Sequence, residues 1–256
     1  KKRVSTKFDM NALQQLSDEQ KAQTVLIVQD PFTSFYDAQV VEDFVLLAQK
    51  LGFNPVLLPF NPNGKPQHVK GFLAEFAKTA KSTAAFLNDI ANLNIPMVGV
   101  DASLLLVYRD EYTKTLGIKR GEFSVLAVHE WLVQHAASAL TNNQAQSEHE
   151  FALFTHCTEK TALPTSEKQW QKIFADAGLE LGIVSVGCCG MAGTYGHEVV
   201  HLQNSKGIYD LSWRDAIARF APEQRAVTGY SCRSQVARYS DGKPRHPLQI
   251  LLNSLL

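Results

Sequence analysis

The sequence predicts an α/β protein built from two pseudo-repeated parallel β-α-β units. Short apolar runs of strand length alternate with longer segments in which apolar residues recur at helical spacing. This order occurs twice along the chain, and helical crossovers between strands are typical of a parallel sheet. The residues with the most distinctive chemistry directly follow the apolar runs of the second half. In a parallel sheet that position is the carboxyl edge, where ligands bind.

In the first half, the predicted strands are compact apolar runs bounded by turn-forming residues. The segment 38–51 has apolar residues at helical intervals, and Gly52 ends it because glycine readily adopts the left-handed C-cap conformation. The elements predicted here are strands at 24–28, 55–59 and 96–100, and helices at 38–51, 69–80, 83–92, 103–114 and 124–138.

The second half repeats this order, which indicates a duplication. A shift of 126 residues superposes Gly52 on Gly178 and residues 61–64 on residues 187–190. We expect an N-terminal extension at 1–22, a cysteine-free repeat at 23–145, and a second repeat carrying the cysteines at 146–256. The second repeat is predicted to contain strands at 151–155, 183–186 and 226–229, and helices at 166–177, directly behind Gly190, at 212–219 and after Cys232.

The composition is that of an ordinary globular protein without strong charge. Lys plus Arg and Asp plus Glu each number 25 among 256 residues, so no basic surface for nucleic acid is expected. No apolar run approaches the ~18 residues of a spanning helix, so no transmembrane segment is expected. Residues 1–7 are basic but no apolar region follows them, unlike in a secretory signal. The four cysteines are too few for a disulfide scaffold, which favours the reducing cytoplasm.

The four cysteines all follow predicted strands of the second half. Because parallel strands end at one edge of a sheet, loops after three of them would bring four thiols together. Thiolates ligate iron–sulfur clusters and zinc, so this constellation predicts a metal site. The corresponding positions of the first half are occupied by Pro and polar residues without thiols, so we expect one site. The expected ligands are Cys157, Cys188, Cys189 and Cys232.

Three glycines surround the paired cysteines and are predicted to help bind the cofactor. Gly187 and Gly190 flank the pair, and Gly193 follows three residues later. Glycine lets the backbone approach an inorganic core, and backbone amides there could donate to sulfur. Two other interpretations stay open at this point. The cysteines could be buried structural thiols around a tight turn, or they could hold structural zinc, although short C-x₂-C knuckles are absent.

The segment 187–198, which reads GCCGMAGTYGHE, resembles the cysteine-rich CCG domain. That domain occurs in heterodisulfide reductase subunits, in glycolate oxidase iron–sulfur subunits, and at the C-terminal end of large FAD-linked oxidases. Cys157 matches the first cysteine of the family pattern, residues 188–190 match its Cys-Cys-Gly, and Cys232 matches its last cysteine. The resemblance covers about residues 24–240 and implies a duplicated CCG-type domain.

The chain departs from the family pattern in two places. Gly229 stands where the family has the first cysteine of a Cys-x-x-Cys motif, and the whole first repeat has lost its cysteines. Four cysteines cannot build a five-cysteine cluster, so we expect one ordinary [4Fe–4S] cluster. A metal completed by His156 or His197 is the alternative, and zinc could occupy the same sulfurs.

The resemblance also implies a function within a larger protein. It is closest to the C-terminal portion of large bacterial flavoproteins that oxidise D-2-hydroxyacids. In these proteins FAD and ferredoxin-like domains of the same parent chain precede the CCG domain. We therefore expect substrate oxidation outside these residues, electron transfer through this domain, and no catalytic residue within it. A redox-inactive docking module is the second function that this sequence leaves open.

A competing motif, H-E-x-x-H, occupies residues 197–201. On one α-helix, His197 and His201 would share a face and could bind zinc, with Glu198 as general base. The motif is short, and Asn204 stands where an extended zinc-protease motif has glycine. A zinc hydrolase is therefore the weaker alternative.

Overall fold

The computed structural model describes residues 7–145 and 150–255 of the chain. The chain divides into two compact units, Lys1–Trp131 and Leu132–Leu256, so the division falls within helix α9 (Val128–His135). Within this division, residues 132–145 fall in the second unit. The Ala145 amide donates to the Ala177 carbonyl at 2.8 Å, for example.

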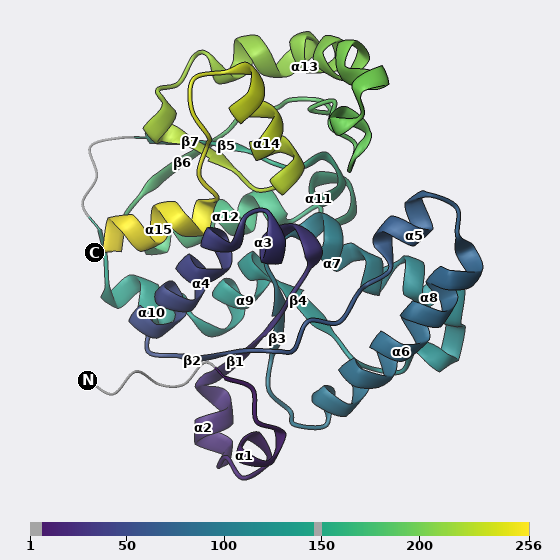
Figure 1. Ribbon diagram of the computed structural model, residues 1–256. Coiled ribbons are helices and arrows are strands. Elements are labelled where there is room, and N and C mark those ends of the chain that lie inside the picture. The colour runs from purple at the N-terminus through teal and green to yellow at the C-terminus, as the bar shows by residue number, and fades with distance from the viewer. Residues whose placement is uncertain (1–6, 146–149, 256) are drawn as a thin grey trace. The chain divides into compact units, whose positions relative to one another are not determined.

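The first unit contains a four-stranded, fully parallel sheet in the order β2-β1-β3-β4 (Figure 1). Its central strand is completely buried and reads Thr-Val-Leu-Ile-Val. The strands are β1 (Thr24–Val28), β2 (Asn54–Leu57), β3 (Met97–Gly99) and β4 (Val125–Ala127). The helices before α9 are α1 (Met10–Gln14), α2 (Asp18–Ala22), α3 (Pro31–Phe35), α4 (Ala38–Lys50), α5 (Lys65–Val69), α6 (Leu73–Ala91), α7 (Ala102–Arg109), α8 (Glu111–Leu116) and the 3₁₀ helix η1 (Gly117–Arg120).

The second unit contains a three-stranded parallel sheet in the order β6-β5-β7. Its strands are β5 (Glu150–Phe154), β6 (Glu180–Ile183) and β7 (Arg225–Val227). Its helices are α10 (Ala137–Asn142), α11 (Cys157–Ala162), α12 (Ser166–Asp176), α13 (Leu202–Ile217), α14 (Tyr230–Tyr239) and α15 (Pro247–Leu255). The 3₁₀ helices are η2 (Tyr195–His197), η3 (Val199–His201) and η4 (Pro222–Gln224).

The two sheets follow one plan, which confirms the predicted α/β fold with two parallel β-α-β units. In each, the first strand is central, the second lies on one side and the third on the other. The correspondence extends past the third strand. In the second unit Arg245 forms a parallel bridge with Ala226 of β7 just before α15, as β4 pairs with β3 just before α9. This strand order places a topological switch point between β5 and β7, where ligands of α/β proteins bind.

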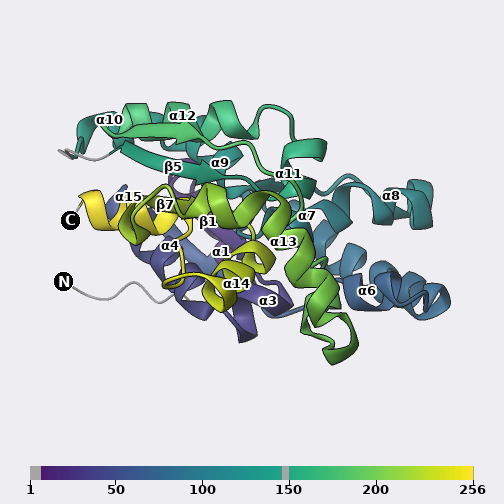
Figure 2. The same ribbon diagram turned by 90° about the horizontal axis from the view of Figure 1, so that it is seen from above.

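Helices cover both faces of the second sheet. In Figure 2, α12 lies on one side of β5, and α13 and α14 lie on the other. The side chains of β5 alternate accordingly. Phe151 stacks edge-on against Phe174 of α12 at 5.9 Å, whereas Phe154 packs against Trp213 of α13 at 5.5 Å. The carboxyl edge of this sheet is thus held between two packed helical layers.

The structure corrects several predicted elements. Residues 73–91 form one helix, α6, where two were predicted across 69–92, and residues 125–127 form β4 where a helix start was predicted. No α-helix begins directly behind Gly190. The chain there makes two 3₁₀ turns, and α13 begins at Leu202, because left-handed residues interrupt the helical path.

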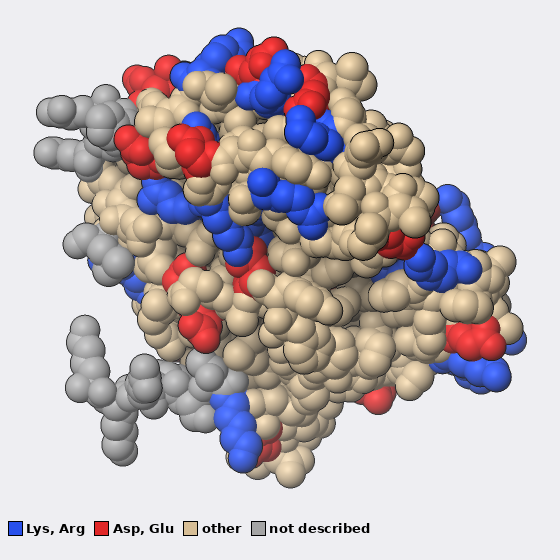
Figure 3. Space-filling view, turned by 45° about the horizontal axis from the view of Figure 1, so that its top comes forward, with Lys and Arg blue, Asp and Glu red and all other residues tan. Residues whose placement is uncertain are grey.

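No helix among the described residues is both long enough and apolar enough to cross a membrane. On the face shown in Figure 3, acidic and basic side chains alternate in small groups. This agrees with the zero net charge of the sequence.

Candidate functional site

The four cysteines lie at the carboxyl edge of the second unit's sheet. Cys157 opens α11 just after β5, Cys188 and Cys189 lie in the loop after β6, and Cys232 lies in the first turn of α14 after β7. Because the three strands are parallel, these loops all leave the sheet at the same edge. Residues that are far apart in the sequence therefore meet there.

The thiols range from exposed to fully buried, and all four are free of disulfide bonds. Cys188 is exposed and Cys157 is partly buried. Cys189 and Cys232 are 3% and 1% exposed and belong to the hydrophobic cluster around Trp213. The group thus extends from the surface into the core of the unit.

The thiols contact one another in a row. Side-chain hydrogen bonds join Cys157 to Cys188, Cys188 to Cys189, and Cys189 to Cys232. The four thiols are thus linked pairwise along one row.

These contacts make Cys188 the thiolate of the group. Hydrogen bonds from Cys157 and Cys189 hold the pKa of Cys188 far below that of an ordinary thiol, assisted by the Gly190 amide. The same hydrogen bonds, together with burial, raise the pKa of Cys157 and of Cys189. The thiols of Cys157 and Cys189 therefore stay protonated and donate to Cys188.

Gly190 shapes the loop around the thiolate. Its amide donates to Cys188 Sγ at 3.3 Å, and its φ of +85° lies in the left-handed region that favours glycine. A Cβ at this position would overlap the Ser205 carbonyl. Ser205 Oγ donates to the Gly190 carbonyl at 2.8 Å and accepts from Gln235 Nε2 at 2.8 Å. The loop is thus fastened to α13 and α14.

The other two predicted glycines have different surroundings. The Gly187 amide donates to Ser212 Oγ at 3.1 Å, and its carbonyl accepts from Trp213 Nε1 at 2.9 Å, so this residue is tied to α13. Gly193 is left-handed with a φ of +70°, and a Cβ there would meet nothing within 4 Å. Of the three, Gly190 is thus the one shown to donate to a cysteine sulfur.

His156 lies beside the thiols, at the start of α11. Its Nδ1 accepts the Thr158 amide at 3.2 Å and so caps the helix, and its own amide donates to Thr228 Oγ1 at 2.9 Å. Its ring packs directly on Gly229. The residue is 8% exposed.

The H-E-x-x-H segment does not form one α-helix, so the helical arrangement that we expected for a zinc hydrolase is not present at residues 197–201. His197 ends η2, Glu198 is extended, and His201 ends η3. His201 stacks on Tyr195 with ring centroids 4.0 Å apart, while His197 Nδ1 lies 3.0 Å from an Arg238 nitrogen. The two imidazoles therefore do not share a helical face.

The donor chemistry of the cysteine cluster suits a soft metal or an iron–sulfur core. Within residues 7–145 and 150–255, however, no group of three or more His, Cys, Asp or Glu side chains is arranged to hold a metal ion. The thiols instead donate to one another. Metal binding would remove their protons and replace these bonds, so the donors fit by type and by proximity without being prearranged.

The sequence analysis missed a buried carboxylate under the site. Glu159, 1% exposed, accepts from Ser166 Oγ at 2.6 Å and from Trp170 Nε1 at 3.3 Å. Burial raises the pKa of Glu159, and hydrogen bonds with Ser166 and Thr228 oppose that rise. In the sequence Glu159 is one polar residue of a short polar helix, so no pattern distinguished it from a solvated one.

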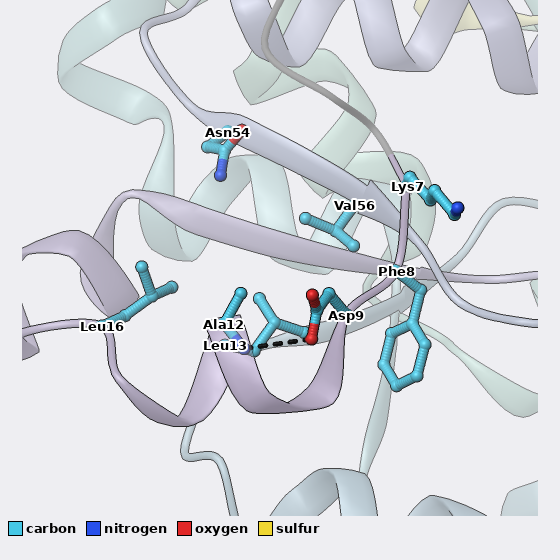
Figure 4. A pocket seen from close by; sticks show the side chains of 8 residues that line it. All are labelled: Lys7, Phe8, Asp9, Ala12, Leu13, Leu16, Asn54 and Val56. Carbon is cyan, nitrogen blue, oxygen red and sulfur yellow. Dashed lines mark hydrogen bonds between the residues drawn. The ribbon is translucent and has the colours of Figure 1, made fainter.

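A cavity of about 370 Å³ lies in the first unit and has no cysteine in its lining (Figure 4). Its lining is mostly apolar, with Asn54 at one side. The Ala12 amide donates to Asp9 Oδ1 at 3.2 Å, and Asp9 caps α1. The lining residues are Lys7, Phe8, Asp9, Ala12, Leu13, Leu16, Asn54 and Val56.

Comparison with known proteins finds close relatives but no matching family model. The chain is 58% identical over 250 residues to a D-2-hydroxyglutarate dehydrogenase of Escherichia coli (strain K12), covering 97% of the chain. Proteins of the same name from Haemophilus influenzae and Pseudomonas putida are 50% and 41% identical, over 96% and 94% of the chain. The chain spans about a quarter of the length of these relatives, 23–24% in each case.

Proposed function

We propose that this chain is the iron–sulfur portion of an FAD-linked dehydrogenase that acts on a D-2-hydroxyacid. Its single [4Fe–4S] cluster would be ligated by Cys157, Cys188, Cys189 and Cys232. The observation that carries the proposal is the row of four thiols, supplied by three loops at one sheet edge. The names of the relatives point to D-2-hydroxyglutarate as the substrate of the whole protein.

The residues of this chain would bind the cluster and tune its charge. A bound cluster would supply a one-electron relay for the flavin of the parent protein. Cys189 and Cys232 approach from the buried side and exclude water, whereas Cys188 lies at the surface. The Gly190 amide donates to Cys188 and would stabilise negative charge on that sulfur.

Substrate oxidation belongs, in this proposal, to parts of the parent protein outside this chain. Those parts are FAD and ferredoxin-like domains, and the setting is the cytoplasm. The chain itself then contributes cluster ligands and no catalytic residue. Its exposed Cys188 side is the side at which electrons would enter or leave.

Anaerobic reconstitution with ferrous iron and sulfide tests the proposal. We expect about four iron and four sulfide per chain, and an electron paramagnetic resonance signal after reduction. Cys188→Ser and Cys232→Ser should each lose most of both. Ser185→Ala, at an exposed position of the same loop, should retain them.

Two other results would overturn the proposal. Tight zinc binding without sulfide uptake would indicate a structural zinc domain. A chain that binds neither metal nor sulfide, yet associates with the flavin part of the parent protein, would indicate a docking module.

A further inference from the structure

Gly229 lies at a position whose backbone does not require glycine. Its φ of −87° and ψ of 136° are ordinary extended values that any residue adopts. The constraint comes from a neighbour. A Cβ built on Gly229 would overlap the His156 ring and would lie 2.8 Å from its Cγ and 2.9 Å from its Cβ.

His156 contacts the starts of two cysteine-bearing helices. Through Nδ1 it caps α11, whose first residue is Cys157. Through its ring it packs on Gly229, the N-cap of α14, which carries Cys232. Its amide also donates to Thr228, the residue before Gly229. The imidazole thus fills the space between the two helix starts.

The hydrogen bond that His156 Nδ1 accepts determines the tautomer of the neutral imidazole. A nitrogen that accepts an amide N–H carries no proton, so the proton of a neutral imidazole resides on Nε2. A neutral histidine that ligates a metal through Nε2 carries its proton on Nδ1 instead. The capping bond and ligation through Nε2 are therefore incompatible for a neutral ring.

We propose that His156 is a positioning residue that spaces the Cys157 and Cys232 helix starts across Gly229, and that it is not a ligand of the site. The second half of this inference, which concerns metal ligation, rests on the proposed function. The first half concerns packing and applies to the metal-free chain.

A double-mutant cycle in the metal-free chain tests the spacing role. Gly229→Ala alone should lower the urea midpoint markedly, because the methyl group overlaps the ring. His156→Ser keeps a helix-capping oxygen and removes the ring, so it should have a smaller effect. The double variant should be more stable than the sum of the single effects predicts. Additive effects would show that the ring and Gly229 do not constrain each other, and would overturn the spacing role.

Spectroscopy of the reconstituted chain tests whether His156 is a ligand. With ¹⁵N-labelled histidine, the reduced cluster should show no strong nitrogen hyperfine coupling. His156→Ser should retain wild-type iron and sulfide, because the side chain that is removed is not a ligand. His197→Ser, the matched control at the other candidate histidine, should retain them as well.

Strong nitrogen coupling in the wild type that disappears in His156→Ser would make His156 a ligand and overturn this part of the proposal. Loss of most of the iron and sulfide from a folded His156→Ser chain would overturn it as well. If no cluster assembles, the proposed function fails, and the unfolding cycle still decides the spacing role.

Discussion

The carboxyl edges of the two sheets share a backbone plan and differ in chemistry. In the first unit Asp30 follows β1 and Asp101 follows β3, and each carboxylate caps the helix that it precedes. In the second unit His156 caps the helix after β5, and Cys157 and Cys232 lie just beyond. Oxygen acceptors at the first edge are occupied by helix amides, whereas thiols at the second edge contact one another.

The loop after the second strand shows the same contrast. Gly64 and Gly190, related by the shift of 126 residues, are both left-handed, with φ of +77° and +85°. In the first unit Asn63 precedes this glycine, and its Oδ1 accepts the Lys65 amide at 3.0 Å. In the second unit Cys189 holds that place. The duplicated scaffold thus keeps its loop conformation while the side chains on it change the chemistry.

The largest expected effect tests the left-handed loop conformation that the two units share. Gly190→Ala should destabilise the second unit by about 3 kcal/mol, because a left-handed alanine is strained and its methyl group overlaps the Ser205 carbonyl. Gly193→Ala, equally left-handed but in open space, should cost about 1–2 kcal/mol. Urea unfolding followed by circular dichroism measures both, and equal losses would contradict the role given to the Ser205 contact.

The next prediction concerns the pH dependence of stability that Asp30 causes at the carboxyl edge of the first unit's sheet. Burial, then the charge of Asp101, raises the pKa of Asp30 to about 7 from 3.8. The folded state therefore holds this proton more tightly than the unfolded state. The stability from it is complete below pH 4 and is lost as pH rises towards 7.

Asp30→Asn keeps a capping side chain and removes the titration. It should match the wild type near pH 4 and exceed its stability by a few kcal/mol near pH 8. Urea midpoints across this range measure the difference. Asp9→Asn, at the exposed N-cap of α1, is the control for replacing a capping carboxylate by an amide. A wild-type profile retained in Asp30→Asn would remove Asp30 as its source.

The sequence predicted the elements that have a strong period and missed those set by tertiary contacts. The central strands 24–28 and 151–155 were visible as apolar runs, and their repetition revealed the parallel plan. The helix expected behind Gly190 fails because Gly190, Ala192 and Gly193 are all left-handed, a feature that spacing does not reveal. Strand β4 is three residues long and is defined by its pairing with β3.

At the site, the sequence indicated which thiols would meet but not how they meet. Parallel strands dictate that Cys157, Cys188 and Cys232 reach one edge, so that part follows from topology. The tautomer of His156 and the burial of Glu159 depend on contacts with residues that follow them and with Thr228, which comes after β7. Such contacts carry no local signature.

A smaller effect concerns reactivity at the second edge. In the metal-free chain Cys188 should react with iodoacetamide at neutral pH at least tenfold faster than Cys189, because it is exposed and its thiolate is stabilised by neighbouring donors. Peptide mass spectrometry over time measures the order of labelling. Cys157→Ser replaces one thiol donor by a hydroxyl and should leave Cys189 slow. First labelling at Cys189 or Cys232 would contradict the arrangement of the row.

The smallest expected effect concerns the segment 197–201. Glu198→Gln should change the unfolding free energy by less than about 0.5 kcal/mol, because Glu198 and His201 form a partly exposed pair with 3.5 Å between Oε2 and Nε2. Metal content after reconstitution should also stay at the wild-type value, since the two histidines of the motif do not share a helix. His197→Ala with Glu198→Gln serves as a second variant. Loss of bound zinc, or of a zinc-dependent peptidase activity, in either variant would restore the hydrolase interpretation and move the chemistry of the second edge from its thiols to this segment.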